Sequence, residues 1–176
     1  EINMKKYKNK LFSILGDSIS TLVGYSTPKY AVFYEESKKY EADIHFPEDT
    51  WWGQVINHLG GSILVNNSFS GSMVIKHPQQ MFPSYGCSDE RTSSLHTIES
   101  TPDVIMVFMG TNDWGAGVRP TPNNETENEN YAIFMCAYRS MLEKIKKNFH
   151  ALLAKSPLTL YNKKRPLRNE VFSLCE

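Results

Sequence analysis

The residues best suited to chemistry in this sequence are Gly16-Asp17-Ser18, which directly follow an apolar run from Leu11 to Leu15. An abrupt change from apolar to polar residues is typical of a buried strand that ends at the edge of a sheet. Open α/β sheets place their ligands at such strand ends, so Ser18 is a candidate nucleophile. A serine in this role needs a base, a group that orients the base, and donors that stabilise an oxyanion.

Two more polar motifs also follow apolar runs. Ser62-Ile63-Leu64-Val65 leads into Asn66–Gly71, and Val104–Met109 leads into Gly110-Thr111-Asn112-Asp113. Parallel strands bring their C-terminal ends to one edge of the sheet, so we expect the three motifs to meet in space. Their meeting would be much harder to obtain by chance than any one motif.

The elements that must position these motifs alternate between strand and helix. Strands are predicted at 10–15, 62–66 and 104–109, and the last is apolar throughout, which favours the middle of a parallel sheet. A helix is predicted from a cap at Asp49 or Thr50 to Gly60-Gly61. With right-handed crossovers, this alternation predicts a three-layer α/β/α sandwich in a single domain over residues 1–176.

The remaining segments are predicted from their composition and periodicity. Residues 25–49 are expected to form a long excursion with a short helix near 31–39, and 72–101 a loop with one short helix. Residues 114–130 are expected to form a loop before an amphipathic helix over 131–149. The predicted buried face of that helix consists of Ile133, Phe134, Ala137, Met141, Leu142 and Ile145.

The three motifs together resemble those of the SGNH hydrolases, the GDSL-type esterases and lipases, over roughly residues 10–150. The resemblance implies a flavodoxin-like parallel sheet, with Ser18 as the nucleophile. It also implies an oxyanion hole built from the backbone N–H groups of Ser18 and Gly71 and the side-chain amide of Asn112. A glycine lets its backbone approach a substrate closely, and an amide donates without a change of protonation state.

Each of these residues also has a simpler interpretation. Ser18 could cap a helix, and Gly71 and Asn112 could be ordinary turn residues. Asp17 and Asp113 are expected to shape their turns by accepting backbone N–H groups. Trp51 and Trp52 are expected to pack in the core.

The last block that the resemblance implies, Asp-x-x-His, is missing from the sequence. None of the five histidines has an aspartate three residues before it, and no aspartate follows Asp113. The segment 151–176 does not continue the family pattern, which suggests a fold truncated at its C-terminal end, with a tail read in a shifted frame. The coding DNA would test this. A histidine of a partner chain, His77 or His96 could replace the missing base.

Composition limits the partners. Lys+Arg and Asp+Glu are both 19, so the net charge is zero, which gives no support for nucleic acid as a partner. No apolar run approaches the ~20 residues that span a bilayer. Three widely spaced cysteines, Cys87, Cys136 and Cys175, suggest neither a metal site nor a disulfide framework, and favour the reducing cytoplasm. A truncated sheet would favour pairing between copies of the chain.

Three functions remain open from the sequence. The first is a serine esterase that cleaves short acyl or acetyl esters of a small molecule, without metal or cofactor. The second is a catalytically impaired relative that acts as a binding or structural domain because it lacks the base. The third is a flavodoxin-like module that binds an anion, which the absence of a phosphate-type glycine loop after the first strand disfavours.

Overall fold

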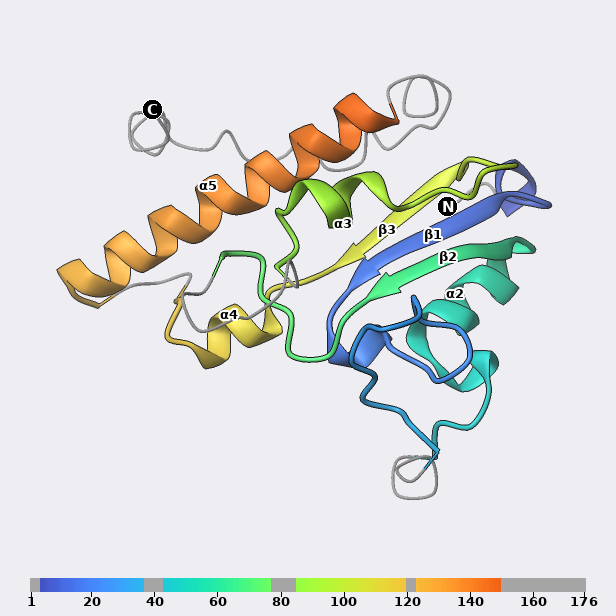
Figure 1. The fold of residues 1–176 in the computed structure, drawn as a ribbon, viewed down its shortest axis with the longest axis horizontal. Helices are drawn as coiled ribbons and strands as arrows, with labels where there is room; N and C mark the ends of the chain where they lie inside the picture. Colours follow the sequence, from blue (N-terminus) through green and yellow to red (C-terminus); the bar gives the residue numbers. More distant parts are fainter. Residues whose placement is uncertain (1–3, 37–42, 77–84, 120–122, 150–176) are drawn as a thin grey trace.

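A parallel three-stranded sheet forms the centre of the molecule (Figure 1). The computed structural model describes four stretches of the chain, residues 4–36, 43–76, 85–119 and 123–149. The strands are β1 (Leu11–Gly16), β2 (Ser62–Ser68) and β3 (Val104–Phe108). Their order is β2-β1-β3, and both pairs are parallel. All three predicted strands are confirmed, and β2 continues two residues beyond the predicted end.

Helices lie on both faces of the sheet, so the predicted three-layer α/β/α arrangement is confirmed (Figure 1). One face is covered by α2 (Trp51–Leu59), and the other by α3 (Asp89–Ser93) and α5 (Glu125–Asn148). The remaining short elements are α4 (Thr111–Gly115) and the 3-10 turns η1 (Met4–Lys6), η2 (Ser18–Ser20) and η3 (Pro47–Asp49). None of the helices in the described stretches is long and apolar enough to cross a membrane.

Among the described strands β1 is central, and the middle position predicted for β3 stays a prediction. In the described part of the chain β3 pairs with β1 alone, and several of its side chains are only half-buried. The centre tolerates the polar Ser13 of β1 because its hydroxyl donates to the Leu95 carbonyl at 2.8 Å. Phe12 and Leu15 of β1 are fully buried on opposite faces, in the clusters beneath α2 and α5 respectively.

The ends of α2 agree with the prediction. The Thr50 side chain accepts from the Gly53 N–H at 3.0 Å and caps the first turn. Gly60 ends the helix with φ +71°, a left-handed conformation that glycine adopts without strain. Trp52 is fully buried and Trp51 half-buried, so the expected packing role of both is confirmed.

Two predictions about loops and helices are wrong. Residues 31–36 are not helical, and 37–39 lie outside the described residues. Part of the predicted loop 114–130 is helical, because α5 begins at Glu125. The Asn124 side chain accepts from the Glu127 N–H at 2.9 Å, so a polar cap starts the helix before its apolar pattern begins.

The apolar face of α5 is narrower than predicted. Met141 and Ile145 are buried against the sheet, and Phe134 and Ala137 pack at the edge of the same cluster. Ile133 is 56% exposed and Leu142 is exposed as well, so these two residues do not belong to the buried face.

The cysteines also differ from expectation. Cys87 is free, whereas Cys136 on α5 is disulfide-bonded, and Cys175 lies outside the described residues. The expectation that the cysteines form no disulfide framework is therefore not met at Cys136. The cytoplasmic location drawn from it loses that support and stays a prediction.

Two substitutions on α5 test which of its faces packs against the sheet. Met141→Ala should lower the free energy of unfolding by about 2–5 kcal/mol, because it leaves a cavity beneath the helix. Ile133→Ala should change it by less than about 0.5 kcal/mol, since its side chain is exposed. Urea denaturation followed by circular dichroism measures both values. Equal losses would contradict the assigned helix face.

Candidate active site

The three polar motifs meet at the C-terminal edge of the sheet. Gly16 at the end of β1 lies opposite Ser68 of β2 and Phe108 of β3. The Phe69 N–H donates to the Gly16 carbonyl at 3.1 Å, which ties the first motif to the second. The predicted convergence of the strand ends is therefore confirmed.

Ser18 is the first residue of η2, immediately after β1. The Asp17 carboxylate caps this turn by accepting from the Ile19 N–H at 3.2 Å. At this position the N–H of Ser18 has no acceptor within the turn, so it can donate to another group. The Ser18 side chain is half-buried. The backbone carbonyl of Ser18 accepts from the Thr21 hydroxyl at 2.7 Å.

The far end of the same turn is fixed by its neighbours. The Ser20 carbonyl accepts from the indole N–H of Trp52 at 3.0 Å and from the Asn66 amide at 2.8 Å. The Ser20 hydroxyl accepts from the indole N–H of Trp51 at 3.0 Å. These bonds join the turn to α2 and β2, so the segment that carries Ser18 is anchored at both ends.

Asn112, on α4, lies beside the loop that follows β2. Its Nδ2 donates to the Ser72 carbonyl at 2.8 Å, which occupies one of the two hydrogens of the amide. Gly71 precedes Ser72, has φ +80° and is exposed, and no atom of the described residues lies within 4 Å of the place where a Cβ would stand. The structure thus brings Gly71 and Asn112 together and leaves open space above the glycine.

The two aspartates of the motifs bind backbone, as expected. Asp113 is fully buried and accepts from the N–H groups of Val74 and Ile75 at 2.9 and 3.2 Å. Burial raises the pKa of the carboxyls of both Asp17 and Asp113, and the backbone donors oppose that rise. Both residues therefore shape their loops.

Arg91, on α3, also belongs to this edge of the sheet and was not predicted from the sequence. Its side chain is fully buried at the edge where β1 and β2 end, and it donates to the Gly16 and Asn67 carbonyls at 2.8 and 2.7 Å. Nothing in the sequence distinguishes it from an exposed arginine, because it follows the charged pair Asp89-Glu90 on a short helix.

A family model described as GDSL-like Lipase/Acylhydrolase matches residues 10–162. The chain belongs to this family. It is 30% identical to a protein from Bacteroides uniformis ATCC 8492 that was solved as a GDSL-like lipase, with a TM-score of 0.60 over 98% of this chain and 79% of that one. A second such protein, from Bacteroides ovatus ATCC 8483, shares the fold at 22% identity and a TM-score of 0.53, over 83% of each chain. No curated protein matches.

The histidines described in this GDSL-family structure have partners other than Ser18, or are exposed. His58 is exposed on α2, and His45 precedes η3, where its backbone N–H donates to Asp49 at 2.9 Å. His96 packs against Phe149, at the end of α5 that points away from the strand ends (Figure 1). No hydrogen bond joins a histidine to Ser18 in the described stretches, and His77 and His150 lie outside them.

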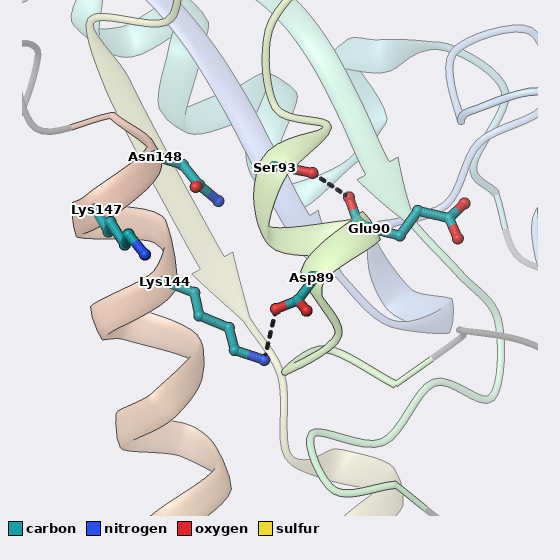
Figure 2. Close-up of a pocket in the computed structure, with 6 residues that line it drawn as sticks. All are labelled: Asp89, Glu90, Ser93, Lys144, Lys147 and Asn148. Carbon is teal, nitrogen blue, oxygen red and sulfur yellow. Dashed lines mark hydrogen bonds and ion pairs between the residues drawn. The ribbon is translucent and has the colours of Figure 1, made fainter.

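A separate pocket of about 470 Å³ opens between α3 and α5 (Figure 2). It is lined by Asp89, Glu90, Ser93, Lys144, Lys147 and Asn148. Lys144 pairs with Asp89 at 2.9 Å and donates to the Cys87 carbonyl at 2.7 Å, so its charge is already used to dock the two helices. In the described residues no cluster of three or more histidines, cysteines or carboxylates could hold a metal ion.

The role of Asp113 can be tested by replacing one carboxylate oxygen. In Asp113→Asn an NH2 group would face one of the two backbone N–H groups that the carboxylate accepts, and a buried donor would lose its acceptor. We expect the free energy of unfolding to fall by about 1–3 kcal/mol, as measured by urea denaturation.

The matched control is Asp89→Asn, because the Asp89 side chain is 91% exposed. In Asp89→Asn the free energy of unfolding should fall by less than about 1 kcal/mol, as for other exposed ion pairs. If the two variants lose the same amount, Asp113 does not organise the loop after β2.

Proposed function

We propose that this GDSL-family chain is a serine esterase that cleaves short acyl or acetyl esters, with Ser18 as its nucleophile. Family membership supports an ester or acyl hydrolase in general. The finer assignment is supported chiefly by one observation. The Asn112 amide is held beside Gly71 through the Ser72 carbonyl, at the same sheet edge as Ser18.

In the proposed reaction, the Ser18 Oγ attacks the ester carbonyl carbon while a base takes its proton. The negative charge that forms on the carbonyl oxygen would accept hydrogen bonds from the N–H groups of Ser18 and Gly71. The second hydrogen of the Asn112 amide would be a third donor. Collapse of this intermediate expels the alcohol, which takes up the proton, and water then hydrolyses the acyl-serine.

The proposed reaction needs a general base for Ser18, and three histidines were considered for that role. His96 is disfavoured because its ring packs against Phe149, beyond the far end of α5. His77 and a histidine from a partner chain remain candidates, and His77 lies outside the described residues. An alkoxide leaving group needs only modest protonation, so an ester is a more suitable substrate than an amide for such a site.

A second function is favoured by the surroundings of Ser18. Its hydroxyl makes no hydrogen bond with any described group, so no described side chain activates it. Without a base, oxyanion stabilisation and binding alone leave about 10³–10⁴-fold acceleration over water. The chain would then be an impaired hydrolase that acts as a binding or structural domain.

Hydrolysis of nitrophenyl acetate and butyrate distinguishes the two functions. Ser18→Ala should abolish the measured turnover, because it removes the nucleophile. Ser62→Ala, an exposed serine at the opposite end of the sheet, should retain it. Equal rates for all three proteins would leave the binding or structural role as the function.

The oxyanion hole is tested by Asn112→Ala in the same assay. Loss of one preorganised donor should lower kcat about 10²–10³-fold while KM changes little, because the bond strengthens only as charge develops. A change confined to KM would instead indicate that Asn112 binds the ester in its ground state.

A further inference from the structure

The buried guanidinium of Arg91 contacts the end of β1, the end of β2 and the loop that follows β2. Its Nη2 donates to the Gly16 carbonyl at 2.8 Å and to the Asn67 carbonyl at 2.7 Å. Its Nε donates to the Asn67 Oδ1 at 2.9 Å, and its Nη1 donates to the Ser72 hydroxyl. The end of β1, the end of β2 and the loop after β2 are thus joined by one rigid, planar group.

Two of these acceptors lie next to the proposed catalytic groups. Gly16 is two residues before Ser18, and Ser72 directly follows Gly71. The Ser72 carbonyl in turn accepts from the Asn112 amide. A displacement of Arg91 would therefore move Ser18, Gly71 and Asn112 relative to one another.

Filling the volume between α3 and the sheet edge does not by itself explain why a charged side chain lies at this position. A buried charge loses its hydration, and an apolar side chain of similar size would fill the same volume at less cost. Among the described residues, Asp17 and Glu90 attract this charge, and the centre of the Tyr30 ring lies 5.8 Å from the guanidinium carbon. Burial lowers the Arg91 pKa only to about 10, so the side chain remains charged at neutral pH.

We propose that Arg91 is a positioning residue, which sets the distance between Ser18 and the oxyanion donors of Gly71 and Asn112. This inference rests on the proposed function of Ser18. It assigns to Arg91 no contact with substrate, since its side chain has no exposed area.

Three variants separate positioning from general stability. Arg91→Lys keeps the charge, but its single ammonium cannot span the acceptors on Gly16, Asn67 and Ser72. Ser72→Ala removes one acceptor of Arg91 and leaves the arginine in place. Lys144→Met is the control, because Lys144 docks α3 to α5 through Asp89 without contacting the site (Figure 2).

The first readout is covalent labelling of Ser18 by a fluorophosphonate. In Arg91→Lys the rate constant at saturating reagent should fall about 10–100-fold, since a small misplacement of reacting groups is enough for such a loss. The half-saturating concentration should stay within about twofold. Ser72→Ala should show a smaller fall of the same kind, and Lys144→Met should label as the unmodified protein does.

The second readout does not depend on chemistry at Ser18. The side-chain amide signal of Asn112 in ¹⁵N-labelled protein is assigned by its loss in Asn112→Ala. It should shift in Arg91→Lys and Ser72→Ala, and keep its position in Lys144→Met. If Arg91→Lys fails to fold, the Asn112 signal in Ser72→Ala alone tests the positioning role.

The outcomes separate the inference from the proposed function. An unchanged Asn112 signal in a folded Arg91→Lys or Ser72→Ala protein overturns the positioning role. A shifted signal in a chain whose Ser18 is never labelled supports the positioning role and overturns the esterase. Equal labelling of Arg91→Lys and the unmodified protein overturns the inference and leaves the esterase standing.

Discussion

The hydrogen bonds of the buried Arg91 guanidinium are the constraint on which the polar edge of this sheet depends. A three-layer α/β fold buries apolar strands between helices, but β1 and β2 both end in polar segments that apolar packing cannot hold. Arg91 supplies donors to the Gly16 and Asn67 carbonyls at that point. The desolvation of its charge is offset only while all of these acceptors stay in place, so the strand ends are held as a unit.

The parts of the fold that follow from local rules could be predicted from the sequence. The strands are short apolar runs, and α2 has a threonine cap and a left-handed glycine at its ends. The order of the described strands, with β1 between β2 and β3, could not be predicted, because an apolar strand covered by helices has the same composition at the edge and at the centre. The start of α5 at Glu125 was missed because a polar cap, not apolar periodicity, begins that helix.

In the candidate site, too, the features set by local sequence could be predicted and those set by distant contacts could not. The convergence of the Ser18, Gly71 and Asn112 segments follows from parallel strands alone, and the turn-shaping roles of Asp17 and Asp113 follow from their residue type. The position of Arg91 could not be predicted in this way, because its acceptors lie 19 to 75 residues away in the sequence. A charged residue on a short helix carries no signal that it will be buried among distant carbonyls.

The two halves of the proposed serine hydrolase site therefore have different structural origins. The proposed oxyanion donors are backbone and amide groups at strand ends, so residues 16–18, 71–72 and 112 can organise them within the described sheet. A base must come from a separate element that reaches over the same edge, and His45, His58 and His96 are not bonded to Ser18. If the proposed donors are fixed by the sheet and by Arg91, they would remain in place whichever element supplies the base. A preorganised oxyanion hole can thus persist in a protein whose nucleophile is inactive, and the identity of the base decides which of the two proposed functions the chain performs.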